Sequence, residues 1–405
     1  MRSSRRSMLK AGVALTAASW PKTALAESAS EGPDTTARHS SFDPWVEVHA
    51  ANLRHNVAEV HHRVSGQPIL AVIKNNGYGA GTANVARILE PLPAVHGFAV
   101  IKLHEALGLR HAGVRKPVLL MGPLAPDEIE VAVAADIAPM VYTPVGEALE
   151  RVAGRLGRTV PIHVCIDTGI GRVGIPHHDA EPLLRDLAGR SSVRIEGIMM
   201  TFTEDVDFDG EQLRRFQALC QSVTTAGIAP GRRHAASSFA LFQRPDSFLD
   251  MVRPGMALFG VYPDPSFRSM GIMDLRPALS LKARVLYVKQ LKKGQSAGYE
   301  RAYKAERDVW VATLPLGHAD GWPRVAAKGA KVRIGDRLYP LVASVSASHC
   351  IAELGPEPTA APGDVAVAFD DRAGSRPEDV SAACGASVYD LLMHLNPLMP
   401  RRIET

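Results

Sequence analysis

Ala71-Val72-Ile73-Lys74-Asn75-Asn76-Gly77-Tyr78-Gly79-Ala80-Gly81 is the stretch on which the fold and the chemistry of this chain depend. The apolar run Ile69 to Ile73 predicts a buried strand that ends in a lysine. Burial lowers the pKa of an amine, and the following glycines let backbone N–H groups approach an anion. This combination suits a Schiff base with pyridoxal 5′-phosphate (PLP). A lysine with a packed stem and a solvated head would give the same pattern.

The composition is that of a globular protein large enough for two domains. The chain has 405 residues, of which 46% are hydrophobic and 22% charged. Its formal charge of +4 is misleading, because residues 1–26 hold five basic residues and no acidic one. Without them the charge is 4 − 5 = −1, which argues against a nucleic-acid partner. The four cysteines lie far apart without metal-type spacing, so buried thiols and no metal site are expected.

The N-terminus has the features of a targeting segment. Ser4 to Lys10 resembles the twin-arginine export signal, Ala11 to Trp20 is apolar, and Ala24-Leu25-Ala26 forms a small-residue cleavage site. We expect a signal peptide over residues 1–26, a disordered spacer over 27–44, and a periplasmic protein without a membrane span. A disordered basic tail is the alternative for this segment.

Short apolar runs alternate with amphipathic helical patterns over residues 45–275 and predict an α/β fold, a (β/α)8 TIM barrel. The expected strands are Pro68–Ile73, Gly97–Val100, Pro117–Met121, Ala138–Val141, Val160–Ile166, Arg194–Met200 and Met256–Val261. About seven strands are evident, so closure of the barrel is an inference. Val-rich runs and Gly-containing turns over residues 276–405 predict a C-terminal β-rich domain, whose one helix is expected over Val380 to Leu395.

Three segments of the sequence resemble the alanine racemase family of fold-type III PLP enzymes. They are Lys74 with Tyr78-Gly79 four residues on, Met251 to Gly260 around Arg253, and Gly317 to Trp322 with its Asp-Gly pair. The resemblance extends from about Trp45 to Arg401. It implies an isomerase that racemises a free amino acid, with L-alanine to D-alanine as the expected reaction, and a homodimer with shared active sites.

The resemblance also implies a set of cofactor-binding residues. Tyr78 and Ser238 would bind PLP, with Ser238 on the phosphate, and the amides of Gly255 and Met256 would hold the same phosphate. Arg253 would contact the pyridine nitrogen and, because arginine keeps its proton, leave that nitrogen unprotonated. From the residues alone, Ser238 could instead cap the next helix, and Arg253 could form a structural ion pair.

For catalysis, the resemblance assigns one base to each face of the substrate carbon. Lys74 would serve the D-face and Tyr299, reaching the site of the partner subunit, the L-face. Arg172 would bind the substrate carboxylate or the phenolic oxygen of the cofactor, and Ala347 would lie at the substrate side. Without the resemblance, Tyr299 would be read as an interface or core tyrosine and Arg172 as a surface residue.

The sequence departs from the family pattern at four places. Cys165 stands where many members have a lysine, Thr201 where a histidine packs on the PLP ring, Ala347-Ser348 where Met-Asp is usual, and Pro397 where a tyrosine is common. The loss of bulk at Ala347 and Pro397 suggests a roomier pocket and a wider substrate range.

Two other functions remain open from the sequence: a PLP-dependent decarboxylase or aldolase on the same fold, and a non-catalytic PLP-binding protein. Arg253 argues against the first, because such decarboxylases generally place an acid at the ring nitrogen. The presence of both Lys74 and Tyr299 argues against the second, because binding requires only the lysine.

Overall fold

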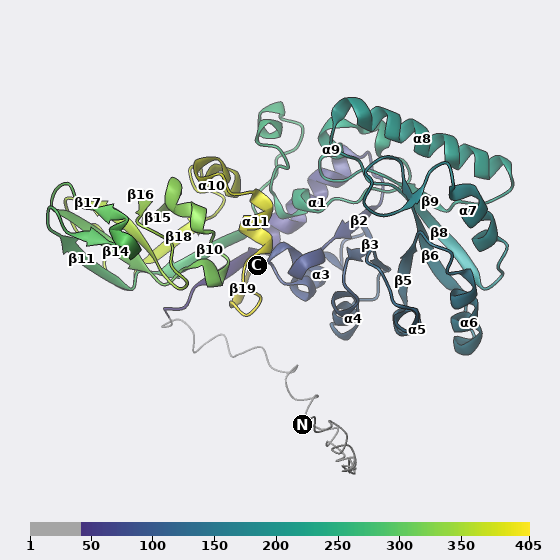
Figure 1. Ribbon diagram of the computed structural model, residues 1–405, viewed down its shortest axis with the longest axis horizontal. Helices are drawn as coiled ribbons and strands as arrows, with labels where there is room; N and C mark the ends of the chain where they lie inside the picture. Colours follow the sequence, from purple (N-terminus) through teal and green to yellow (C-terminus); the bar gives the residue numbers. More distant parts are fainter. Residues whose placement is uncertain (1–41) are drawn as a thin grey trace, which may run out of the picture. The chain divides into compact units, whose positions relative to one another are not determined.

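Parallel strands alternate with helices in the first half of the computed structural model, which describes residues 42–405 (Figure 1). The sheet has the order β2-β3-β4-β5-β6-β8-β9, and every neighbouring pair is parallel. Its strands are β2 (Ile69–Val72), β3 (Val95–Val100), β4 (Val118–Leu120), β5 (Ile137–Val141), β6 (Val160–Asp167), β8 (Val193–Met199) and β9 (Arg232–His234), and β7 (Ile175–Pro176) pairs with β6. The expected signal peptide and the spacer as far as residue 41 lie outside the described residues.

The helices between these strands have buried faces at helical spacing. In α8 (Val206–Thr225) the buried residues include Leu213, Phe216, Cys220 and Val223, which recur every three or four positions. Asp205 caps this helix by accepting a hydrogen bond from the Phe208 amide. The other helices of this half are α1 (Ala50–Arg63), α2 (Lys74–Tyr78), α3 (Thr82–Leu89), α4 (Leu103–His111), α5 (Pro126–Ala134), α6 (Gly146–Leu156), α7 (Ala180–Ala188) and α9 (Ala240–Gln243).

Residues 250–254 close the sheet into a barrel. Val252 forms a parallel bridge with Ile69 of β2, and its carbonyl accepts from the Leu70 amide at 2.9 Å. On the other side, the Arg253 amide donates to the Ala236 carbonyl just after β9, at 2.8 Å. The predicted barrel is therefore present, with an extended segment at the eighth strand position.

The prediction of the last barrel strand over Met256–Val261 is wrong. Met256–Phe259 form a short 3-10 helix, η2, which ends at Gly260 in the left-handed region (φ 77°). A Cβ at Gly260 would lie 1.7 Å from the Arg276 carbonyl, so the chain passes that carbonyl at a distance only glycine permits. An apolar run of this length does not distinguish a strand from a buried helical turn.

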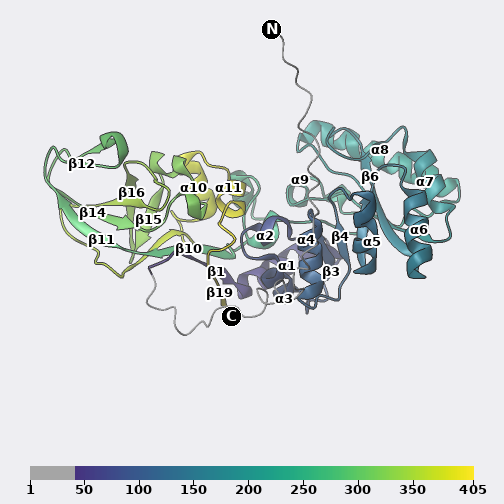
Figure 2. The same cartoon turned by 60° about the horizontal axis from the view of Figure 1, so that its bottom comes forward.

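A second sheet of nine strands forms the rest of the described chain (Figure 2). Its order is β11-β14-β17-β16-β15-β18-β10-β1-β19, and a separate hairpin pairs β12 with β13. The strands are β1 (Trp45–His49), β10 (Leu279–Arg284), β11 (Tyr287–Leu291), β12 (Ser296–Ala297), β13 (Tyr303–Lys304), β14 (Val309–Leu314), β15 (Lys331–Ile334), β16 (Arg337–Val342), β17 (Cys350–Gly355), β18 (Val365–Phe369) and β19 (Arg401–Glu404).

Two features of this half differ from the sequence expectation. The barrel was expected to begin at residue 45, but β1 lies between β10 and β19 in the second sheet. The single expected helix over Val380–Leu395 is two helices, α10 (Pro377–Cys384) and α11 (Val388–Met393). Gly385, in the left-handed region at φ 74°, ends the first of them.

Candidate active site

Lys74 lies at the carboxyl end of β2, where the active sites of parallel barrels are built. The turn that follows is strained, with Asn75 and Asn76 in the left-handed region at φ 52° and 57°. Burial lowers the pKa of the Lys74 amine, and the nearby Arg172 guanidinium lowers it further against an opposing contribution from Glu105. The lysine is thus held as an amine that loses its proton more readily than a solvated one.

Glu105 of α4 is the residue that fixes this turn, and the sequence reasoning missed it. Its carboxylate is buried and accepts from the Asn76 amide at 2.9 Å, and from the amides of Ile101 and Lys102 at 3.4 and 3.3 Å. It therefore joins the loops that follow β2 and β3. Acidic residues are common in the first turn of surface helices, so this role of Glu105 has no signal in the sequence.

The turn is also held from the second half of the chain by α11 and the residues after it. A Cβ at Gly79 (φ 90°) would lie 2.3 Å from the Leu392 carbonyl, so α11 packs directly on the glycine. Arg401 donates from Nε to the Gly79 carbonyl at 3.0 Å, and the Asn75 amide group contacts the Met393 sulfur at 3.5 Å. The glycines after Lys74 therefore allow this close packing, in addition to the anion binding expected from the sequence.

Tyr78, Ser238, Gly255 and Met256, four of the predicted cofactor-binding residues, converge beside the lysine. The buried Tyr78 ring stacks on Phe259 with centroids 4.8 Å apart, and a Cβ at Gly255 would lie 2.3 Å from the Tyr78 hydroxyl. Ser238 Oγ accepts from the Gly255 amide at 2.9 Å and from the Ala257 amide at 3.1 Å, so this hydroxyl lies at the start of η2, which begins at Met256.

This corner has the donors that a phosphate monoester requires. Burial raises the pKa of the Tyr78 phenol, so its hydroxyl keeps its proton and can donate. Ser237 Oγ is buried without a hydrogen-bond partner among residues 42–405. An unpaired buried hydroxyl beside Ser238 and the backbone of η2 fits a phosphate group, and Lys74 nearby fits the aldehyde of PLP.

Arg253 is buried at the centre of the site and is held by carbonyl groups. Its Nη2 donates to the Met200 carbonyl at 2.7 Å, and its Nη1 donates to the carbonyl of His234 and, at 3.1 Å, to Nδ1 of the same histidine. Burial lowers the pKa of Arg253 to about 10, so the guanidinium remains charged at neutral pH. No described carboxylate pairs with it, which disfavours the structural ion pair considered above.

The contact with Arg253 fixes the proton of His234. Burial, together with the charge of Arg253, lowers the pKa of His234 well below its usual value, so the ring is neutral. Since Nδ1 accepts from Arg253, the proton is on Nε2, which donates to His163 Nδ1 at 2.8 Å. Burial likewise lowers the pKa of His163 to about 3. Two neutral histidines therefore extend the hydrogen bonding of Arg253 through the barrel interior.

Arg172 lies in an exposed loop after β6. Its positive charge lowers the pKa of Lys74. Asp167 orders this loop through its Oδ1, which accepts from the amides of Gly169 and Gly171 at 2.8 and 3.2 Å. Cys165, in the position of the usual lysine, is buried, and burial raises the pKa of its thiol to about 11. The neutral thiol does not replace the charge of a lysine beside Arg172.

Tyr299 and Ala347 are not brought to Lys74 within one chain. Tyr299 lies in the hairpin between β12 and β13 and is 75% exposed, and its side chain makes no hydrogen bond or ring contact to any described residue. Ala347 packs against Gly317, where a Cβ would lie 2.2 Å from the Ala347 carbonyl. Thr201 follows β8, and its carbonyl accepts from Gln212 at 3.2 Å.

Pro397 stands where a tyrosine is common in the family, and the structure places another tyrosine, Tyr389, near Tyr78. Tyr389, in the first turn of α11, lies close enough to Tyr78 for its charge to raise the Tyr78 pKa. Burial and the Glu204 carboxylate raise the pKa of Tyr389 to about 12, so this phenol also keeps its proton. Pro397 instead borders a separate surface pocket with Asn75 and His394. No local pattern in the sequence marks Tyr389 for this position.

The profile of the family described as "Alanine racemase, N-terminal domain" matches residues 48–263, and that of "Alanine racemase, C-terminal domain" matches residues 278–403. The chain belongs to the alanine racemase family. Alanine racemases from two bacteria match nearly all of this chain and nearly all of their own length. The alanine racemase of Symbiobacterium thermophilum is 33% identical over 86% of this chain and 93% of its own. That of Sorangium cellulosum is 32% identical over 88% and 97%.

Solved structures of family members have the same fold. The alanine racemase of Streptomyces coelicolor A3(2) superimposes with a TM-score of 0.83 at 28% identity, over 91% of this chain and 99% of its own. That of Bacillus anthracis, described with bound L-Ala-P, gives 0.81 at 29% identity, over 90% and 96%. The expected barrel followed by a β-rich domain is confirmed. Among residues 42–405, no helix is long and apolar enough to cross a membrane, and no three potential ligands cluster for a metal ion.

Proposed function

We propose that this protein is a PLP-dependent racemase that interconverts L-alanine and D-alanine. The observation that carries the proposal is the convergence of Lys74, Tyr78, Ser238 and Arg253 at the carboxyl end of one barrel. The family membership and the named relatives support the same reaction. When bound, PLP supplies an electron sink that makes the Cα–H bond of an amino acid acidic.

Within this frame, Lys74 acts as the base on one face of Cα. Its lowered pKa brings the amine closer to neutral pH, where a proton acceptor is most effective. Arg172 binds the substrate carboxylate, since its charge lies near enough to Lys74 to lower the pKa of that amine. Arg253 remains charged and does not give up its proton easily, so it would contact the pyridine nitrogen of PLP without protonating it.

The second base comes from another copy of the chain. A racemase needs a proton donor on the face opposite Lys74, and Tyr299 is 75% exposed and has no contact with Lys74 in its own chain. We infer a homodimer in which Tyr299 of the partner subunit completes each site. The exposed hairpin between β12 and β13, which carries this tyrosine, supports the arrangement.

Two finer proposals rest on the sequence. Ala347 removes bulk where the family usually has methionine, so substrates larger than alanine are expected to react. The twin-arginine motif of residues 4–10 supports export to the periplasm.

The test is incubation of the PLP-loaded protein with L-alanine in D2O. Racemisation predicts deuterium at Cα and the appearance of both enantiomers, followed by NMR and chiral chromatography. L-Serine, L-lysine and L-arginine in parallel rank the substrate range. Exchange into one enantiomer without inversion, or release of carbon dioxide, would refute the racemase assignment.

A further inference from the structure

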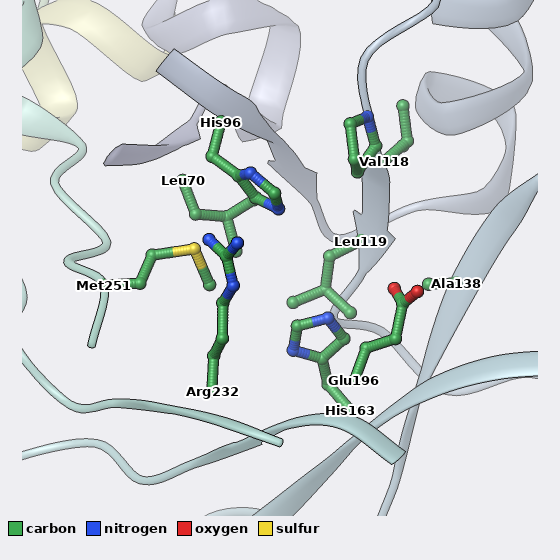
Figure 3. A pocket seen from close by; sticks show the side chains of 10 residues that line it. Leu70, His96, Val118, Leu119, Ala138, His163, Glu196, Arg232 and Met251 are labelled. Atoms are coloured by element: carbon green, nitrogen blue, oxygen red, sulfur yellow. The ribbon is translucent and has the colours of Figure 1, made fainter. Parts of the chain in front are cut away.

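A second ionisable cluster lies at the opposite mouth of the barrel. A cavity of about 210 Å³ is bordered there by residues from the first halves of the barrel strands (Figure 3). Its polar lining is His96, His163, Glu196 and Arg232, and its apolar wall includes Leu119 and Met251. Of these side chains, only His163 is connected to the catalytic site described above, through its hydrogen bond with His234.

His163 presents a buried N–H group to this cavity. Its Nδ1 accepts from His234, as the chain of contacts from Arg253 requires, so the proton of the neutral ring is on Nε2. The side chain is buried, yet Nε2 has no acceptor among residues 42–405. His163 lines the cavity, so this donor is available there to an acceptor from solution.

The charges at this mouth favour an acceptor that is an anion. The Arg232 side chain is exposed and makes no hydrogen bond or ion pair within the described part of the chain. Glu196 is the only carboxylate among the lining residues, and Arg194 already pairs with it. Arg232 therefore has no ion pair of its own, although it feels the charge of Asp250, which pairs with Arg233. It lies next to His96, which is half-buried and whose pKa is lowered by burial and by the charge of Arg232.

We propose that this mouth binds a small monocarboxylate anion, with its oxygens on Arg232 and on the Nε2–H of His163 and its alkyl group on the apolar wall. Arginine suits a carboxylate because its guanidinium can donate two parallel hydrogen bonds. The apolar wall of Leu119 and Met251 favours an alkyl carboxylate over a bare inorganic ion. His163 and His234 link the anion by hydrogen bonds to Arg253, the residue proposed to contact the pyridine nitrogen of PLP.

The test is a titration of the PLP-loaded protein, labelled with 15N-histidine, with propionate. The readout must be local, because a carboxylate can also enter the catalytic site beside Arg172. The His163 and His96 signals are assigned with His163→Asn and His96→Gln. We expect a saturable shift of His163 Nε2 with propionate and none with propionamide, which has the same shape without the charge.

The variant Arg232→Ala is expected to weaken this binding at least about tenfold and to retain racemase activity in the absence of propionate. Arg151→Ala, an exposed arginine on α6 outside the cavity, is the matched control and should bind normally. No saturable shift, an equal shift in Arg232→Ala, or an equal shift with propionamide would overturn the proposal and leave a water-filled cavity. Equal binding of chloride would overturn the carboxylate assignment. Racemisation of alanine, measured separately, decides the proposed function independently.

Discussion

The loop that bears Lys74 and the hairpin that bears Tyr299 differ in every physical respect. Lys74 is followed by a turn fixed by Glu105 and covered by α11, and its pKa is lowered by burial. Tyr299 is 75% exposed and contacts no described side chain through a hydrogen bond or ring. One half of the proposed chemistry is thus complete within a chain, and the other half is presented outward.

The largest effect is expected from removing Lys74, the base whose surroundings are complete within one chain. Lys74→Ala removes the group that attaches PLP and the base on one face, so racemisation should fall by at least about 10³-fold in both directions. The measurement is initial rates from L- and D-alanine, together with the visible absorbance retained after gel filtration. Lys102→Ala, an exposed lysine at the start of α4, is the control and should change neither quantity greatly. Racemisation by Lys74→Ala at close to the wild-type rate would refute the role assigned to Lys74.

The loss of the Tyr299 hydroxyl is expected to lower the racemisation rate nearly as much, and to change the stability of the protein little. Tyr299→Phe should lower activity by about 10²- to 10³-fold, because a proton donor is lost, while thermal unfolding is unchanged since the side chain is exposed. Tyr287→Phe, at another exposed tyrosine, on β11 of the nine-stranded sheet, is the control.

Mixing the two inactive variants distinguishes a shared site from one built within a chain. Subunit exchange between Lys74→Ala and Tyr299→Phe produces dimers in which one site has both mutations and the other has neither. Random exchange should therefore restore roughly a quarter of the wild-type activity. No recovery after demonstrated exchange would show that Tyr299 does not act across the interface.

The phosphate corner offers a smaller and more local perturbation. Gly255→Ala places a Cβ 2.3 Å from the Tyr78 hydroxyl, so the free energy of unfolding should fall by about 1–3 kcal/mol and PLP should bind less tightly. Gly108→Ala in α4 is the control, because no atom lies within 4 Å of its Cβ, and a gain of about 0.4–1 kcal/mol is expected. Denaturant unfolding and fluorescence titration with PLP measure the two effects. Equal behaviour of the variants would mean that the Tyr78–Gly255 contact does not form.

The sequence was sufficient where a local pattern decides the structure. The alternation of strands and helices predicted the barrel, and the strand expected over Val160–Ile166 is present as β6, Val160–Asp167. It was insufficient where partners distant in the chain decide. β1 carries a strand pattern, but only its pairing with β10 and β19 assigns it to the second sheet. Met256–Phe259 was misread because a short apolar run fits a strand or a helical turn equally well.

The same limit applies to the site. Lys74 and Arg253 stand in recognisable motifs, so their positions could be predicted from the sequence. Glu105 acts through backbone amides, and Tyr389 acts from a helix at the far end of the chain, so neither could be found without the fold. Residues whose role depends on tertiary contacts have no local signature.

The smallest expected effect concerns pH and the neutral histidines behind Arg253. The pKa of His163 is about 3 in the folded protein and 6.5 as the reference, so the unfolded state binds more protons between these values. Folding stability must then fall as pH is lowered through this window. One such proton corresponds to about 1.4 kcal/mol per pH unit.

His163→Asn keeps an acceptor near the Nδ1 position for His234 but cannot titrate. We expect the slope of unfolding free energy against pH, between about 4 and 6, to be smaller than in the wild type by about this amount. A constant offset from altered packing leaves the slope unchanged, so an identical slope in both proteins would mean that His163 is already protonated in the folded state, and the directed chain of hydrogen bonds from Arg253 could not exist as described.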